Sequence, residues 1–158
     1  MDKFQVVDIS WGERNKVSYD AGYDQHNLPE EDCAYLEGCG FYCIYGRHPV
    51  YGQDVLLYIG ETKEGEDGVR SFRARLTEHF GGRFWYHQNL SFSLGVAQQE
   101  LSFHEVQLVE SILVAAHKPA LNRMHIDCAK KGSENILVRN WDFPGALQHE
   151  CTGSYWRQ

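Results

Sequence analysis

The sequence predicts a single α+β domain with a small central three-stranded antiparallel sheet flanked by helices. Three short stretches rich in β-forming residues lie at 41–45, 55–59 and 90–94. Two stretches with apolar residues at helical spacing lie at 69–80 and 106–116. Because 158 residues suit one compact core, we expect the remaining residues to form N- and C-terminal extensions.

The first two strands are predicted by their composition and by the turn between them. The stretches FYCIY at 41–45 and VLLYI at 55–59 are dominated by aromatic and branched side chains. Turn-prone residues separate them, namely Gly46, Pro49 and Gly52. We therefore expect a hairpin or a pair of adjacent strands.

The third strand and the two helices follow from periodicity. Residues 90–94 alternate apolar and polar side chains, as a half-buried strand does. Residues 69–80 place apolar side chains three or four positions apart, as one face of a helix does. The second helix is predicted to begin at a capping box formed by Ser102 and Glu105, and to be apolar over most of its circumference through residue 116.

Composition restricts the class of protein. No uninterrupted apolar run approaches the roughly 20 residues that span a bilayer, and the first residues, MDKFQ, lack the pattern of a secretory signal. The five cysteines are scattered without a C-x-x-C pair, which argues against a disulfide framework and favours a reducing compartment. We expect a cytoplasmic protein with no membrane partner.

The charge balance opposes binding to nucleic acid over the whole surface but permits it locally. The net charge is −7, whereas proteins that bind nucleic acid usually carry a basic surplus. Residues 70–83 nevertheless contain four arginines and one acidic residue, Glu78. A local and strongly salt-dependent contact with DNA is therefore expected at this segment.

Five short motifs follow one another along the chain. They are Gly40-Phe41-Tyr42, Tyr58-Ile59-Gly60, Arg75-x-x-x-His79, Glu110, and Pro119-Ala120-Leu121-Asn122. In type, order and spacing this set resembles the GIY-YIG nuclease superfamily over residues 40–122. The sequence departs from the family pattern at Phe41, where Ile or Val is usual, and in a longer span between the two tyrosines, which we expect to form a longer hairpin loop.

The resemblance implies a domain organisation and an activity. It implies a GIY-YIG-like nuclease core at 39–125, an N-terminal extension at 1–38, and a C-terminal extension at 126–158 packed on the core. It also implies a Mg²⁺- or Mn²⁺-dependent DNA endonuclease that uses direct attack by water and leaves 5′ phosphate and 3′ hydroxyl ends. The absence of a separate recognition domain suggests a stand-alone restriction, phage or repair enzyme. Formation of a homodimer would supply double-strand cleavage, and RNA is a lesser alternative substrate.

The resemblance also implies roles for the two tyrosines. A phenol has a pKa near about 10, so its action as a base needs help from a cation or a metal. By analogy, Tyr42 deprotonates or positions the attacking water and Tyr58 supports it. The alternative is that both are cross-strand aromatics of the core.

Arg75 and His79 share one face of the first predicted helix because they stand four residues apart. A guanidinium stabilises the charge that develops on a phosphate during cleavage, and this role is assigned to Arg75. His79 is implied to hydrogen-bond near Tyr42 or the phosphate, and a structural residue at the edge of the core is an equal alternative. Arg70 and Arg73 are expected to contact DNA outside the catalytic centre or to be solvated charges.

Glu110 is the expected metal ligand, because a single carboxylate with waters and a phosphate suits Mg²⁺. Glu100 and Glu105 are rivals, although the capping box already occupies Glu105. Asn122 is expected to bind substrate or to fix the backbone near the site. Lys63 is placed near the phosphate, with a mobile surface lysine as the alternative. The competing function is a catalytically inactive module of the same fold that binds nucleic acid or protein, which the acidic balance favours.

Overall fold

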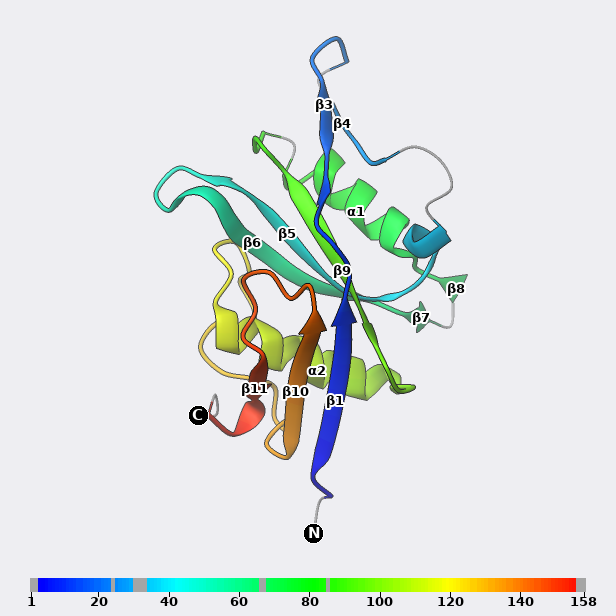
Figure 1. Cartoon of the computed structure of the whole chain (residues 1–158), viewed down its shortest axis with the longest axis vertical. Coiled ribbons are helices and arrows are strands. Elements are labelled where there is room, and N and C mark those ends of the chain that lie inside the picture. Colours follow the sequence, from blue (N-terminus) through cyan, green and yellow to red (C-terminus); the bar gives the residue numbers. More distant parts are fainter. Residues whose placement is uncertain (1–2, 24, 30–33, 66–67, 85, 156–158) are drawn as a thin grey trace.

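A large, curled, mixed sheet organises the part of the chain that the computed structural model describes, residues 3–23, 25–29, 34–65, 68–84 and 86–155 (Figure 1). The elements, in chain order, are β1 (Gln5–Trp11), β2 (Asn15–Lys16), β3 (Ser18–Asp20), β4 (Gln25–Asn27), η1 (Ala34–Glu37), β5 (Gly40–His48), β6 (Gly52–Thr62), β7 (Glu64–Gly65), β8 (Gly68–Val69), α1 (Phe72–Gly81), β9 (Ser91–Ala97), α2 (Phe103–His117), β10 (Ile136–Asp142), β11 (Glu150–Thr152) and η2 (Gly153–Tyr155).

Seven strands of the described residues join this sheet, in the order β11-β10-β1-β9-β5-β6, with β2 pairing beside β1 on β9. The pair β1 and β10 is parallel, and the other neighbours are antiparallel. Strands β3 and β4 form a separate hairpin, as do β7 and β8. Strand β6 therefore lies at one edge of the sheet.

The prediction of a small three-stranded sheet is wrong. The three expected strands exist as β5, β6 and β9 and pair antiparallel, but both predicted terminal extensions add strands to the same sheet. Residues 5–11 form β1, which pairs with β9 on one side and with β10 on the other. The pattern QVVDISW, with Val7, Ile9 and Trp11 buried on one face, is that of a half-buried strand. Its parallel partner, β10, lies more than 120 residues further along the chain, and no local sequence pattern predicts their pairing.

Both predicted helices form among the described residues, although α1 begins at Phe72, three residues after the predicted start at residue 69. Helix α1 begins after Ser71, whose side chain accepts a hydrogen bond from the Ala74 amide. Helix α2 begins with the predicted capping box. The Ser102 hydroxyl accepts from the Glu105 amide at 3.3 Å, and the Glu105 carboxylate accepts from the Ser102 amide at 2.7 Å. Neither helix combines the length and the apolar character that crossing a bilayer requires.

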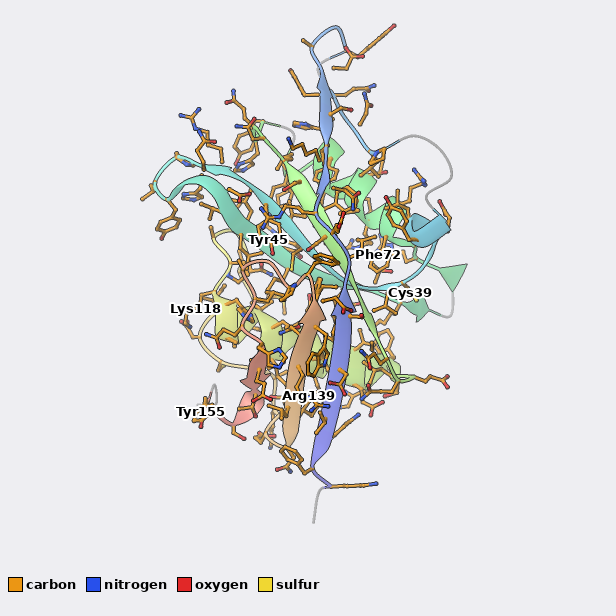
Figure 2. The ribbon with its side chains drawn as sticks, in the orientation of Figure 1. Cys39, Tyr45, Phe72, Lys118, Arg139 and Tyr155 are labelled. Atoms are coloured by element: carbon orange, nitrogen blue, oxygen red, sulfur yellow. The ribbon has the colours of Figure 1, made fainter. Side chains whose placement is uncertain are left out.

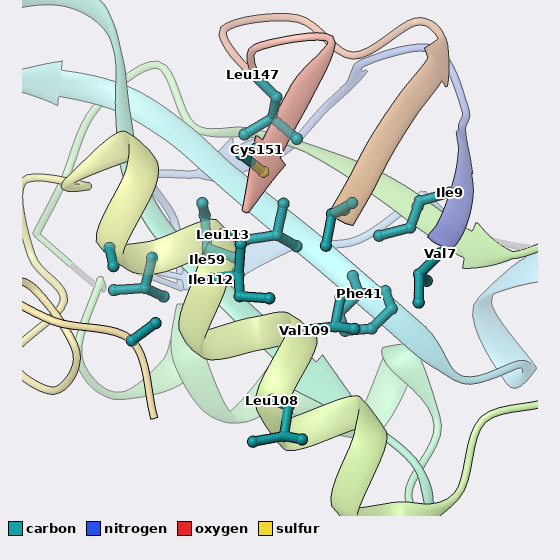
Figure 3. Close-up of a cluster of buried hydrophobic side chains, with 14 of the residues drawn as sticks. Val7, Ile9, Phe41, Ile59, Leu108, Val109, Ile112, Leu113, Leu147 and Cys151 are labelled. Carbon is teal, nitrogen blue, oxygen red and sulfur yellow. The ribbon is translucent and has the colours of Figure 1, made fainter. Parts of the chain in front are cut away.

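Apolar side chains gather in two clusters, each associated with one helix. One cluster joins α2 to side chains of β1, β5, β10 and β11, including Ile9, Phe41 and Cys151 (Figure 3). The other joins Phe72 and Phe80 of α1 to side chains of the sheet and of the segment after α1, namely Tyr42, Ile44, Leu57, Phe84 and Phe92. Alternate residues of β5 supply the two clusters, because successive side chains of a strand point to opposite faces. The helices are thereby held on opposite faces of β5.

The hairpin of β5 and β6 carries both motif tyrosines. The extra residues between them lengthen the two strands, which project from the body of the molecule (Figure 1), so the prediction of a longer hairpin loop is wrong. The register places Tyr42 opposite Gly60, with shifts farther along the hairpin after Ile44 and after Gly46. A Cβ at Gly60 would collide with the Tyr42 phenol and lie 2.9 Å from Tyr58 Cε1. The Tyr42 ring can occupy this position only because Gly60 has no side chain.

Replacement of Ile9 tests whether β1 belongs to the cooperative core. Ile9 is fully buried in β1, so Ile9→Ala is expected to lower the free energy of unfolding by about 2–5 kcal/mol. Phe4 is 61% exposed just before β1, so Phe4→Ala is expected to change it by less than about 0.5 kcal/mol. Urea denaturation followed by tryptophan fluorescence measures both values, and an unchanged midpoint for Ile9→Ala would contradict the role of β1.

Replacement of Gly60 tests the close approach to Tyr42. Because the Tyr42 ring is fully buried and cannot swing aside, Gly60→Ala is expected to destabilise the fold by about 1–3 kcal/mol. Gly81, at the end of α1, has nothing within 4 Å of an added Cβ, so Gly81→Ala serves as the matched control. It should leave stability unchanged or raise it by up to about 1 kcal/mol. Equal effects of the two substitutions would refute the steric explanation.

Candidate active site beside the edge strand

The five residues expected to act in catalysis come from four separate elements and lie in one region. Tyr42 lies on β5, Tyr58 on β6, Arg75 and His79 on α1, and Glu110 on α2. The charges of Arg75 and Glu110 both act on the pKa of Tyr42 and of Tyr58. The region therefore lies beside β6, the edge strand, where side chains of both helices meet.

Tyr42 and His79 form a buried hydrogen-bonded pair. The distance between Tyr42 Oη and His79 Nε2 is 2.8 Å, and the Tyr42 side chain is 0% exposed. Burial, together with the charges of Arg75 and Arg83, lowers the pKa of His79 to about 4. The imidazole is therefore neutral at pH 7.

The direction of the Tyr42–His79 hydrogen bond follows from Arg75. Burial raises the pKa of Tyr42 well above its ordinary value, while the charge and the hydrogen bond of the Arg75 guanidinium act against that rise. A guanidinium can only donate, so the phenol oxygen accepts from Arg75, and the Tyr42 hydrogen goes to His79 Nε2 in the tautomer that carries its hydrogen on Nδ1. Arg75 also donates to the Glu78 carboxylate at 2.8 Å, which fixes the guanidinium.

Tyr58 is half-buried, with its ring beside those of Tyr42 and His79, and it lines a pocket. Its ring centroid lies 4.8 Å from that of His79 and 6.2 Å from that of Tyr42. Burial, followed by the charge of Glu110, raises the pKa of Tyr58. The adjoining pocket has a volume of about 400 Å³ and is lined by Tyr58, Arg83, Gln107, Glu110, Asn122 and Lys130, among others.

Glu110 presents a carboxylate to this pocket. Burial, followed by the charge of Glu61, raises the pKa of Glu110 to about 7, although Arg75, Lys63 and Lys130 lower it. No residue in the described ranges donates a hydrogen bond to the Glu110 side chain. The described residues contain no group of three or more acidic, histidine or cysteine side chains arranged around a metal position. A single unsatisfied carboxylate beside a second acidic group fits Mg²⁺, which takes oxygen ligands and keeps several waters.

The two rival carboxylates have other surroundings. Glu105 is engaged by Ser102 in the capping box and by Gln5 Nε2, which donates to it at 2.8 Å. Glu100 is exposed and lines a different pocket. Of the three candidates, Glu110 is the one that faces Tyr58 and Arg83.

The residues expected to bind substrate are dispersed. Arg70 and Arg73 lie on the surface, outside the lining of the Glu110 pocket, where they pair with Glu78 and Glu37 at 2.6 Å in each case. Lys63 is largely buried rather than a mobile surface lysine. Its Nζ lies 3.7 Å from the Glu61 carboxylate and over the ring of Phe103, and burial lowers its pKa.

Asn122 lines the pocket and also secures the edge strand. Its side-chain amide donates to the Ile59 carbonyl and accepts from the Ile59 amide, both at 2.9 Å. The neighbouring amides of Ala120 and Leu121 donate to the carbonyls of Leu56 and Leu57. Residues 120–122 thus satisfy the outer edge of β6 in the way an added strand would.

Three charged residues near the site were not singled out from the sequence. Glu61 directly follows the Tyr58-Ile59-Gly60 motif, and Arg83 follows the glycines that end α1. The Arg83 guanidinium carbon lies 5.2 Å from the Tyr58 ring centroid. Lys130 comes from the segment after the motifs, and no sequence pattern marks it. Proximity in the chain to a motif is a usable signal for the first two.

No protein-family model, curated protein or solved structure matches this chain. Its function has to be inferred from the chemistry of these side chains.

The opposed pKa shifts of His79 and Glu110 predict opposite effects of pH on stability. As the pH falls from 6.5 towards 4, the unfolded chain protonates His79 while the folded protein resists, so stability is lost. As the pH falls from about 7 towards 4.5, the folded protein protonates Glu110 before the unfolded chain does, so stability is gained. The two effects partly cancel in the parent protein.

Single variants separate the two effects. Between pH 7 and pH 4.5, Glu110→Gln is expected to lose on the order of 2 kcal/mol of unfolding free energy more than the parent, because only the His79 effect remains. His79→Phe is expected to gain a similar amount relative to the parent. Urea titrations in EDTA at both pH values measure the slopes. Slopes of the same sign in the two variants would contradict these shifts.

Proposed function

We propose that this protein is a metal-dependent DNA endonuclease of the GIY-YIG type, which hydrolyses phosphodiester bonds by direct attack of water and leaves 5′ phosphate and 3′ hydroxyl ends. The observation that supports the proposal most is that Tyr58 and Glu110 line one pocket and that the charge of Arg75 acts on both side chains. A nucleophile activator, a cation for the phosphate and a ligand for a metal are the three functions that this hydrolysis needs.

Arg75 stabilises the phosphate charge in the proposed reaction. Its guanidinium is held by Glu78 and remains partly exposed, with 26% of the side chain accessible. Fixed donors that are oriented before the reaction stabilise developing negative charge without a cost of reorganisation. Arg83 and Lys130 add positive charge at the pocket wall, where the flanking phosphates of a DNA strand would lie.

The tyrosines and His79 handle the proton of the attacking water. Tyr58 orients the water, because its ring lines the pocket. The Tyr42 hydroxyl, with its hydrogen directed at neutral His79, offers a route on which a proton ends at His79 Nε2. In this transfer Tyr42 gives its own proton to His79 as it takes one from the water. Tyr42 therefore need not become a phenolate, although its pKa is raised.

Glu110 would hold the metal ion, with Glu61 nearby to orient its waters. A bound Mg²⁺ or Mn²⁺ ion supplies stabilisation of the charge on the leaving 3′ oxygen. With one protein carboxylate, most of the coordination would come from water and from substrate phosphate.

The proposal extends to the type of enzyme and to the way it binds DNA. We infer a restriction, phage or repair enzyme in the cytoplasm, acting on DNA, with a homodimer providing cleavage of both strands. With a net charge of −7, binding to DNA depends on a local cluster of cations and should weaken steeply as salt rises.

A second candidate function is an interaction module of the same fold without catalysis. The fully buried Tyr42 side chain favours it, because Tyr42 does not line the pocket in which the attacking water would lie. This module would bind nucleic acid or protein and would cleave neither DNA nor RNA.

Nicking of supercoiled plasmid separates the two functions. The parent protein with Mg²⁺ or Mn²⁺ is expected to nick the plasmid, and EDTA is expected to abolish nicking. Arg75→Ala and Glu110→Gln should each lower the rate by on the order of 10²-fold or more, because each removes a group that acts in the transition state.

Matched controls guard against nonspecific loss of activity. Arg139→Ala removes a half-buried guanidinium that pairs with Asp8 on the far strands (Figure 2), and Glu100→Gln removes an exposed carboxylate outside the pocket. Both should retain nicking. If the parent protein binds DNA but nicks neither plasmid nor RNA with either metal, the interaction module replaces the nuclease.

A further inference from the structure

A second pocket lies beside the β3–β4 hairpin, on the side of β9 that carries α1. Its volume is about 560 Å³, and its wall joins the hairpin to the segment before β9. Aromatic and polar side chains line it, including Tyr19, His26, Tyr86, His87, Gln88 and Asn89. This mixture of flat rings and hydrogen-bonding groups is typical of a site for a planar, polar ligand.

His87 carries an unused hydrogen-bonding atom at this pocket. The side chain is 7% exposed, and its Nδ1 lies 3.3 Å from the Arg47 carbonyl oxygen. A carbonyl only accepts, so Nδ1 donates its hydrogen to it, and Nε2 is the acceptor in that tautomer. Nε2 is buried and has no hydrogen-bond partner among the residues that the structure describes. A buried acceptor without a partner is costly, and a ligand that donates an N–H would satisfy it.

Two tyrosines offer flat surfaces at the same pocket. The side chains of Tyr86 and Tyr19 are 62% and 52% exposed. The Tyr86 ring lies 4.5 Å from that of His87, with an interplanar angle of 30°. Exposed aromatic faces of this kind stack with nucleobases in proteins that bind single-stranded nucleic acid.

One phenylalanine connects this pocket to the candidate active site. The Phe84 ring centroid lies 5.5 Å from that of His79, 5.9 Å from that of Tyr58 and 5.6 Å from that of His87. Two ring-to-ring steps of less than 6 Å therefore separate Tyr58 from His87. The pocket and the candidate active site therefore lie on either side of the Phe84 ring.

We propose that the pocket of Tyr19, Tyr86 and His87 receives an unstacked nucleobase of the DNA strand that enters the active site, with His87 Nε2 accepting from an N–H of the base. The proposal rests on the proposed function, because it takes DNA as the substrate. It adds a structural preference, namely for DNA in which one base is unpaired or easily extruded. The net cost of extrusion is least at a bulge, so bulged DNA is the sharpest probe.

The test compares three short labelled duplexes of one sequence: fully paired, with one bulged adenosine, and with an abasic bulge. Fluorescence anisotropy in Ca²⁺ measures Kd for each. The parent protein should bind the adenosine bulge on the order of tenfold more tightly than the abasic bulge, as expected for one stacked base. Tyr86→Ser and His87→Phe should each remove most of this ratio, because one removes a stacking face and the other the acceptor.

Tyr155→Ser is the matched control, since Tyr155 is 83% exposed at the opposite end of the molecule (Figures 1 and 2). It should retain the ratio. Circular dichroism checks that each variant folds, and Tyr86→Ser decides alone if His87→Phe does not fold. Equal Kd values of the parent for the adenosine and abasic bulges overturn the proposal.

Plasmid nicking by the same preparations separates this proposal from the proposed function. Nicking without a base-dependent ratio overturns the base pocket and leaves the nuclease standing. A base-dependent ratio without nicking supports the base pocket and contradicts the nuclease.

Discussion

The contact between Tyr42 and the bare backbone of Gly60 is the constraint on which the rest of the site depends. The β5–β6 register sets the two residues opposite each other, and the phenol occupies the volume that a side chain at Gly60 would need. From that position the Tyr42 hydroxyl reaches His79 on α1. A slip of the hairpin by one residue would turn Tyr42 to the other face of the sheet, towards α2.

The site balances charges of both signs in a partly buried setting. Burial and positive neighbours hold His79 neutral, while burial and Glu61 bring the pKa of Glu110 to about 7. Each shift has a cost in isolation, since a charged group is disfavoured where water is excluded. Arrangements of this kind are frequent where a protein acts on a charged ligand, because the ligand or its metal supplies the missing charge.

Local patterns in the sequence were sufficient for the two helices and for β5, β6 and β9, and insufficient for the whole sheet. The capping box at Ser102 and the apolar spacing of α1 are local, and both predictions are confirmed. The strand β1 has a clear alternating pattern, yet its place between β9 and β10 is decided by residues far along the chain. Pairing over such distances has no signature in a single sequence, so the three-stranded sheet was too small.

The candidate site likewise contains residues that the sequence predicts and residues whose positions depend on the fold. The motif residues are recognisable by type and order, and the structure brings Tyr42, Tyr58, Arg75, His79 and Glu110 into one electrostatic neighbourhood. Lys130 and the buried position of Lys63 could not be predicted, because both depend on where the chain folds back across α2 and β6. The hydrogen bonds of Asn122 to Ile59 likewise require knowledge that β6 is an edge strand.

The parallel pairing of β1 with β10 has a consequence for how the protein is made. Residues 5–11 leave the ribosome well before their partners at 136–142. Until then the nascent chain exposes one open strand edge of β1, which is able to pair with other chains. The sheet can therefore be completed only after residues 136–142 have emerged, and a ribosome stalled within α2 would hold a product with an exposed, aggregation-prone strand edge.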